Sequence, residues 1–173
     1  MNLPLGYQYA ATYAGIRQAE KNDLALIVSG LAANAAAVFT QNRVQASPVK
    51  LCRRHLRVSR GLAGAILVNA GNANCATRTG DAVALSSAKA AAKLLKLPLA
   101  QVLAASTGVI GVELEARKIT GALPKLVKCL APDRFDDVAR AIMTTDTVPK
   151  TAFAEVALRR GAVRIAGMTK GSG

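Results

Sequence analysis

The sequence predicts a single α/β domain over residues 1–173, in which helices pack on a sheet of short apolar strands. Short apolar runs that end in polar loops alternate with helical segments, which is typical of an α/β layered fold. The chain has 173 residues and is 51% apolar, which is enough to bury one core. With three Phe, three Tyr and no Trp, that core should be packed from alanine and other small residues.

Apolar runs bounded by turn residues predict four strands in the body of the chain, at 24–28, 35–39, 64–69 and 101–106. A turn containing Ser29-Gly30 separates the first two, which we expect to be neighbours. The third is the clearest strand, because the polar run 69–74 cuts it off. The fourth leads directly into Thr107-Gly108.

Helical patterns lie between and after these strands, at 47–56, 81–97, 113–130 and 132–143. Ser47 followed by Pro48 predicts an N-cap with proline at the first helical position. Asp81 in the first turn and Pro98 beyond the end bound the second helix. The third helix is expected to break near 121–124, which contains a glycine and a proline.

The C-terminal part predicts a hairpin, because the apolar segments 152–158 and 162–166 flank Arg159-Arg160-Gly161. The last six residues, 168–173, read Met-Thr-Lys-Gly-Ser-Gly. A domain that finished here would end in a flexible glycine-serine stub, so we expect a cut end. Residues 1–6 do not resemble a secretory signal, and the sequence has no run of about twenty apolar residues. We therefore expect a cytoplasmic protein without a membrane span.

The formal net charge of +13 raises the alternative of a nucleic-acid-binding domain. The densest basic cluster contains Arg53, Arg54, His55, Arg57 and Arg60. Six aromatic residues offer few stacking platforms, and the sequence has no zinc-finger, helix-turn-helix or RNP signature. We favour an acidic partner chain or an anionic substrate as the reason for the charge, and expect no nucleic-acid partner.

The three cysteines, Cys52, Cys75 and Cys129, are widely spaced and form no C-x-x-C pair. Their odd number and spacing predict reduced, mostly buried thiols rather than a metal site.

Three polar loops follow strands or helices: 68–74 (Val-Asn-Ala-Gly-Asn-Ala-Asn), 106–111 (Ser-Thr-Gly-Val-Ile-Gly) and 144–150 (Thr-Thr-Asp-Thr-Val-Pro-Lys). Loops held by rigid elements are where chemistry is usually placed. Taken alone, the asparagine run is typical of a turn, and Asp146 could cap a local turn.

The loop 106–111 places the Thr107 hydroxyl beside the Gly108 N–H, the two donors that an oxyanion-binding corner needs. It is neither a Walker A loop nor a dinucleotide-binding G-x-G-x-x-G. The sequence supplies no nucleophile-and-base pair to go with it, so we infer that the chain contributes one half of an active site.

Together and in this order, with 168–173, the three loops resemble the ornithine acetyltransferase family of arginine biosynthesis, the glutamate N-acetyltransferases. The resemblance extends from Gly15-Ile16-Arg17 to Gly173 and departs from the family pattern at 74–80, where the family has fewer residues. It implies that this is the α chain of a precursor that cleaves itself before a threonine, soon after 168–173. The β chain would complete the layered fold and remain bound in an α2β2 heterotetramer.

The resemblance further implies transfer of an acetyl group from N-acetylornithine to glutamate through an acetyl-threonine intermediate, giving ornithine and N-acetylglutamate. The nucleophilic threonine would begin the β chain, with its own α-amino group as base. Thr107 and Gly108 would stabilise the oxyanion, and Thr147 and Lys170 would bind substrate. Without the resemblance, Lys170 would be taken for an exposed lysine in the tail, and His55 is interpreted as a surface or packing residue.

The resemblance implies no metal ion or bound cofactor, and leaves acetyl-CoA open as a second acetyl donor. The alternatives are a related self-processing hydrolase, an acetyltransferase paralogue of a secondary pathway and, less favoured, a basic nucleic-acid-binding domain.

Overall fold

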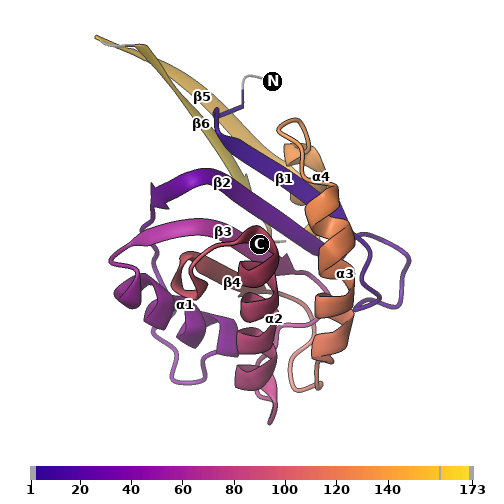
Figure 1. The fold of residues 1–173 in the computed structure, drawn as a ribbon. Helices are drawn as coiled ribbons and strands as arrows, with labels where there is room; N and C mark the ends of the chain where they lie inside the picture. The colour runs from indigo at the N-terminus through magenta and orange to yellow at the C-terminus, as the bar shows by residue number, and fades with distance from the viewer. Residues whose placement is uncertain (1–2, 160, 172–173) are drawn as a thin grey trace.

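A four-stranded mixed sheet forms the middle layer of the structure, a computed structural model that describes residues 3–159 and 161–171 (Figure 1). Its strands, in spatial order, are β1 (Tyr7–Thr12), β2 (Leu24–Asn34), β3 (Leu62–Asn69) and β4 (Val102–Ser106). Strands β1, β2 and β3 pair antiparallel, whereas β3 and β4 are parallel, with Asn69 opposite Ser106. The carboxyl ends of β3 and β4 therefore meet at one edge of the sheet.

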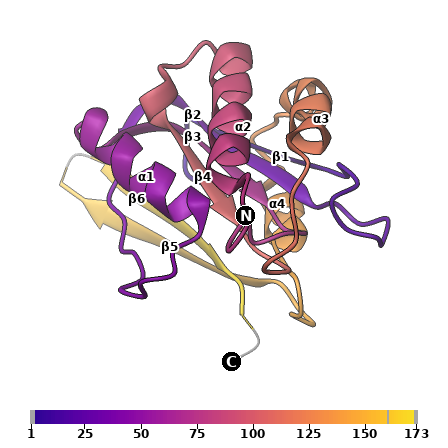
Figure 2. The ribbon, with the colours of Figure 1, turned by 90° about the horizontal axis from the view of Figure 1, so that it is seen from below.

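Helices cover both faces of the sheet (Figure 2). On one face lie α1 (Ser47–Val58), α2 (Gly80–Leu95) and α3 (Ala116–Lys128); on the other lie α4 (Phe135–Ala141) and a two-stranded ribbon. Side chains alternate across a strand. Leu24 and Leu26 of β2 accordingly join the cluster under α1–α3, whereas Ala25 and Ile27 join the cluster under α4. These layers confirm the predicted α/β layered class.

The main core between the sheet and α1–α3 is packed from small residues, as the composition predicts. Helix α2 contributes Ala84, Ala88, Ala91 and Ala92, all buried. On the opposite face the core contains large aromatic side chains: Phe135 contacts Tyr9 edge-on at a centroid distance of 5.4 Å. Phe135 also contacts Phe153 at 5.3 Å, which ties the ribbon to α4.

The ribbon consists of β5 (Lys150–Leu158) and β6 (Gly161–Thr169), paired antiparallel, and confirms the predicted hairpin. Arg160 of the predicted turn lies outside the described residues. Phe153 pairs with Ala166 on the face that contacts Phe135. The opposite face carries four large apolar side chains that are 45 to 58% exposed, namely Val156, Leu158, Val163 and Ile165. Figure 1 shows the ribbon extending well past the sheet.

The predicted strand at 35–39 is wrong. Strand β2 continues through Ser29-Gly30 to Asn34, and its register against β3 shifts between Val28 and Ala33. Ser29 and Gly30, which suggested a turn, lie in this bulge within a continuous strand. Residues 35–39 leave the sheet without regular structure, and Phe39 instead lies under Arg53, with the guanidinium 5.2 Å from the ring centroid.

The predicted break in the third helix is also wrong, because α3 runs without interruption through Pro124. Its residues Ile119, Leu123 and Leu126 share one face and are buried in the main core. That burial outweighs the loss of one backbone hydrogen bond at the proline, which costs about 3 kcal/mol in an exposed helix.

Smaller corrections concern the ends of elements. The cap of α1 is Ala46, so Ser47 and Pro48 lie inside the first turn. Helix α2 ends at Leu95, with Lys96 in the left-handed conformation, and α4 is shorter than the predicted 132–143. Gln101 belongs to a short 3-10 turn, Leu99–Gln101, that precedes β4.

Two further differences concern β1 and the cysteines. Strand β1 has no counterpart among the predicted strands; it is short and its central Ala10 is fully buried. Only Cys52 is buried, whereas Cys75 and Cys129 are half-buried, and all three are free thiols. None of the helices in the described ranges is long and apolar enough to cross a bilayer.

Candidate functional site

Polar loops leave the carboxyl ends of β3 and β4, and Asn69 ties the two together. The side-chain amide of Asn69 donates to the Asn72 carbonyl (2.7 Å) and to the Ser106 hydroxyl (3.2 Å). Its side-chain oxygen accepts from the N–H groups of Gly71 (3.0 Å) and Asn72 (3.2 Å). The asparagines therefore hold the loop, which agrees with the interpretation of this run as a turn.

The loop that follows β3 also supports the segment after Thr107. The Asn72 side chain donates to the Val112 carbonyl (2.9 Å), and the Gly111 N–H donates to the Cys75 carbonyl (3.0 Å). Glu113 accepts from the Thr79 hydroxyl and from the Arg78 N–H (2.7 Å), and both contacts lower the pKa of the Glu113 carboxyl. Residues 74–80, where we expected a departure from the family pattern, thus support the segment 107–113.

The Thr107-Gly108 corner requires glycine at its second position. Gly108 has a φ of +134°, and a Cβ there would lie 2.4 Å from the carbonyl carbon of Gly71. Thr107 is held by its own N–H, which donates to the Asn69 carbonyl (2.9 Å). Within the described part of the chain the Gly108 N–H donates to no backbone carbonyl, so it is available to another acceptor.

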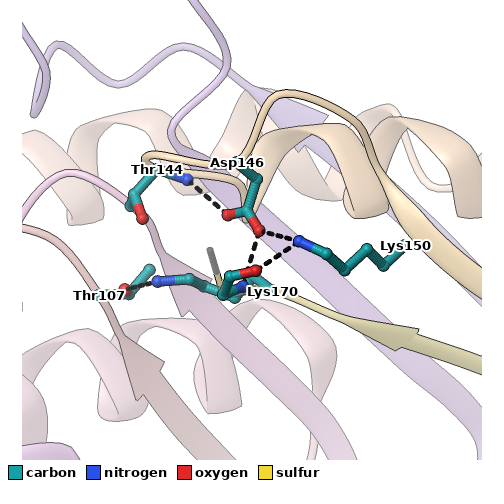
Figure 3. A network of polar contacts seen from close by, with 6 residues as sticks. Thr107, Thr144, Asp146, Lys150 and Lys170 are labelled. Carbon is teal, nitrogen blue, oxygen red and sulfur yellow. Dashed lines mark hydrogen bonds and ion pairs between the residues drawn. The ribbon is translucent and has the colours of Figure 1, made fainter. Parts of the chain in front are cut away.

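Lys170, which is distant in sequence, reaches the same corner (Figure 3). Its ammonium group donates to the Thr107 hydroxyl oxygen at 2.8 Å. A hydroxyl has one hydrogen to donate besides its acceptor lone pairs. Because Thr107 Oγ1 already accepts from a cation, its own hydrogen is free to point elsewhere and is polarised as a donor.

Asp146 fixes the segment that carries Lys170. Its side chain is 1% exposed and accepts from the Gly171 N–H and from Lys150 Nζ, both at 2.7 Å. Lys150 in turn donates to the Gly171 carbonyl, and Figure 3 shows its ion pair with Asp146 as a dashed line. Lys150 and the backbone donors hold the pKa of the Asp146 carboxyl well below its usual range. The sequence indicates Asp146 only as a possible turn cap. Lys150, four residues later, is a local signal for the ion pair, whereas the contact with Gly171 arises from the fold.

The structure brings Thr107, Gly108 and Lys170 to one corner, whereas Thr147 stands apart. Thr147 is exposed in the loop between α4 and β5. As far as the described residues go, it takes no part in the hydrogen bonds around Asp146 and Lys170. Its substrate-binding role therefore stays a prediction.

A cavity of about 330 Å³ opens beside Thr107 and Lys170. Its other walls are mainly apolar and include Ile27 of β2, Val68 of β3, Ala105 of β4, Val138 of α4 and Met168 of β6. A volume of this size suits a small ligand, and a few polar groups on an apolar wall are typical of a binding site. His55 lies elsewhere: it is buried, and its Nδ1 donates to the Val102 carbonyl at 2.7 Å, which makes it a packing residue.

Comparison with known proteins identifies the family. Residues 8–173 match the sequence profile of the ArgJ family. The chain belongs to the ArgJ family. It is 44% identical over 171 residues to the "Arginine biosynthesis bifunctional protein ArgJ" of Nitratidesulfovibrio vulgaris, covering 98% of this chain and 43% of that protein. The protein of the same name from Thermosynechococcus vestitus is 45% identical, over 97% of this chain and 40% of its own length. The chain therefore spans about two-fifths of these ArgJ relatives.

Solved structures of ArgJ proteins share the fold. The crystal structure of ArgJ from Bacillus halodurans superposes with a TM-score of 0.89 at 32% identity, covering 98% of this chain and 88% of the other. Ornithine acetyltransferase from Mycobacterium tuberculosis, solved in complex with ornithine, gives 0.86 at 31% identity, covering 98% and 90%. The resemblance to the ornithine acetyltransferases that the sequence motifs indicate is thereby confirmed.

Proposed function

We propose that this chain supplies the oxyanion-binding half of an ornithine acetyltransferase active site. The enzyme would move an acetyl group from N-acetylornithine to glutamate. One observation carries the proposal: Lys170 donates to the Thr107 hydroxyl beside the available N–H of Gly108, at the mouth of a ligand-sized cavity. The names of the ArgJ relatives, and of the M. tuberculosis protein solved with ornithine, support this reaction.

The corner suits a reaction that passes through a tetrahedral intermediate. When a nucleophile attacks the acetyl carbonyl, negative charge develops on the carbonyl oxygen. The Thr107 O–H and the Gly108 N–H would both donate to that oxygen, with the Lys170 ammonium adding its charge from behind Thr107. Donors placed in advance stabilise such charge without reorganisation at the moment of reaction.

The nucleophile would be a threonine that begins the β chain, since the family precursor is expected to cleave itself there. Its hydroxyl would lose its proton to its own α-amino group and attack the acetyl carbon; the amine of ornithine would leave with that proton. Glutamate's amine would then attack the acetyl-threonine through a second oxyanion at the same corner. The ester bond would break, and the threonine oxygen would leave with the proton that the amine gives up through the same α-amino group. Lys170 and Thr147 would orient the amino-acid part of the substrate, for which a lysine suits the α-carboxylate.

The remaining part of the family's chain would cover apolar surface that is exposed here. The outer face of the ribbon and the loop after Gly108, where Val109, Ile110 and Val112 are more than half exposed, are the surfaces concerned. We propose that 1–173 is the α-chain domain, that 168–173 leads to the cleavage site, and that the assembly is an α2β2 heterotetramer in the cytoplasm. Finding no second chain with an N-terminal threonine in the purified protein would contradict this.

The experiment that tests the reaction uses the full-length protein that carries this chain, with N-acetylornithine and glutamate, and identifies the acetylated product. We expect N-acetylglutamate and, for Thr107→Ala, a fall in kcat of about 10²–10³-fold, the usual loss for one oxyanion donor. Thr107→Ser keeps the hydroxyl and should retain most of the activity. Because self-cleavage passes through the same kind of oxyanion, it should slow in Thr107→Ala as well.

Acetate released to water would instead indicate a hydrolase, and an unchanged rate in Thr107→Ala would remove the assigned role. The same assay with acetyl-CoA in place of N-acetylornithine tests the second donor, which the word "bifunctional" in the relatives' name supports.

A further inference from the structure

Arg17 joins two loops of the candidate site that are far apart in the sequence. Its Nε donates to the Ala70 carbonyl, and its Nη2 donates to the carbonyls of Met143 and of Ala141, the latter at 3.3 Å. Ala70 directly precedes Gly71, which touches Gly108. Met143 directly precedes the Thr144–Asp146 segment that holds the tail of the chain. One guanidinium thus spans the two sides of the site.

The contact between Arg17 and the oxyanion corner is close enough to transmit position. A Cβ on Gly71 would come within 2.6 Å of Ile16 Cγ2 and 3.1 Å of Arg17 Cγ. A Cβ on Gly108 would come within 2.4 Å of the Gly71 carbonyl carbon. The segment of Ile16 and Arg17, the Gly71 peptide and Gly108 therefore lie too close together for a side chain at either glycine. In such close packing, we expect a shift of the first to displace the last.

The backbone of Arg17 is itself anchored on a buried carboxylate. Asp23, at 0% exposure, accepts from the N–H groups of Ala14 (2.7 Å), Ile16 (2.7 Å) and Arg17 (2.9 Å). The Asp23 carbonyl also accepts from the Ala70 N–H at 2.8 Å. Arg17 is therefore held at both ends, by Asp23 at its main chain and by three carbonyls at its guanidinium.

On the other side of the site, the contacts continue from Met143 to the lysine. Asp146, three residues after Met143, binds the Gly171 N–H, and Lys170 next to it binds Thr107. Arg17 is thus connected to the Gly108 N–H through Gly71 and to the Thr107 hydroxyl through Asp146 and Lys170.

We infer that Arg17 is a positioning residue for the acetyl transfer, setting the Gly108 donor and the Lys170–Thr107 pair relative to each other. This inference rests on the proposed function. Arg17 acts on the site through backbone, because its Nε and Nη2 groups donate to main-chain carbonyls and not to Thr107, Gly108 or Lys170. A planar fork with several fixed donors can hold carbonyls of two segments at once, whereas the single ammonium of a lysine cannot hold them in the same geometry.

The test compares Arg17→Met and Arg17→Lys with wild type in the full-length protein. We expect kcat for acetyl transfer to fall at least tenfold in Arg17→Met while KM for N-acetylornithine changes less than threefold, with Arg17→Lys in between. Arg117→Met is the matched control: that side chain is 84% exposed and, among the described residues, pairs with the exposed Glu115, so its kcat should not change. In Arg17→Ala, added guanidinium ion at millimolar concentration should restore part of kcat.

An active wild type with unchanged kcat in Arg17→Met would overturn the inference and leave the proposed function standing. The inference would also be overturned if kcat falls only in proportion to the fraction of folded protein and added guanidinium does not restore it. A wild type without acetyl transfer would overturn the proposed function. Amide hydrogen exchange tests whether Arg17 holds the two segments together. In Arg17→Met the exchange rates should rise in both 70–74 and 143–147. A rise in one segment alone, or in neither, would overturn the inference.

Discussion

The proposed role of Thr107 depends on the hydrogen bond that its hydroxyl oxygen accepts from Lys170. Many threonines follow a strand and precede a glycine, and such a hydroxyl usually bonds to nearby backbone. Here Lys170 donates to the oxygen from outside, which leaves the hydroxyl hydrogen for an acceptor in the cavity. The sequence places Thr107 beside Gly108, but only the fold brings Lys170 to it, across sixty-three positions.

Alanine substitutions at Gly108 and Gly111 distinguish the cost of a steric clash from the cost of a strained backbone. Gly108→Ala would place a Cβ 2.4 Å from the Gly71 backbone at a φ of +134°, whereas Gly111→Ala meets nothing within 4 Å at a φ of +79°. Gly111→Ala should cost about 1–2 kcal/mol, the usual penalty for a left-handed residue. Gly108→Ala should cost clearly more in the free energy of unfolding and should abolish transfer. Denaturant unfolding of both variants checks this, and equal losses would contradict the close packing at Gly71.

At the scale of elements, the parallel pair β3–β4 determines where the site forms. Two polar loops that leave neighbouring parallel strands must meet, so the loops after Asn69 and Ser106 were predictable as neighbours once the pairing is known. The sequence predicted these strands well, because each is a short apolar run with a polar end. It failed at 35–39 and at Pro124, where a bulge and a buried helix face override local signals.

The loop between α4 and β5 gives a prediction about acid. Lys150 and the backbone N–H groups of Gly171 and Thr144 lower the pKa of Asp146 from its usual 3.8 in the folded state. A carboxyl whose pKa is lowered by folding stabilises the folded state at every pH above its pKa in the unfolded chain. That contribution is lost as the pH falls from the unfolded pKa towards the folded pKa. Asp146→Asn should therefore destabilise the protein at pH 7, and its difference from wild type should shrink progressively below about pH 4.

Denaturant unfolding at pH 7, 4 and 3 measures this difference, with Asp133→Asn at an exposed position as the control. A difference between wild type and Asp146→Asn that stays constant over this range would show that the carboxylate is not held as described.

For the whole molecule, the exposed apolar faces, and not the charge, mark the surface that a partner chain would cover in the proposed assembly. Lys50, Arg53, Arg54 and Arg57 lie exposed on the outer side of α1, while Leu51 and His55 on its inner side are buried. This face is an ordinary solvated helix surface, and it lies on a different side of the sheet from the ribbon (Figure 2). The apolar side chains of the ribbon and of the loop after Gly108 are not covered in the described structure. They are therefore the surfaces on which the other half of the proposed site would pack.

The sequence predicts those parts of the site that are adjacent in the chain, and misses those that only the fold brings together. Thr107 and Gly108 are adjacent in sequence, so their pairing is readable from a motif. Arg17, Asp146 and Lys170 act through contacts between segments that are far apart, and no local pattern encodes those contacts. The resemblance to a family supplied Lys170 but gave no reason for Asp146 or Arg17. The close packing at Gly71 explains Arg17, and the hydrogen bond from the Gly171 N–H explains Asp146.

The measurement that tests this account most directly is a double-mutant cycle on Thr107 and Lys170, read as kcat/KM for acetyl transfer in the full-length protein. If the lysine acts by holding the threonine hydroxyl, Thr107→Ala, Lys170→Met and the double variant should not be additive. We expect an interaction free energy of about 1 kcal/mol or more, because the second substitution removes a contact already lost. Additive losses, with an interaction near zero, would contradict the claim that the two residues form one oxyanion-binding unit.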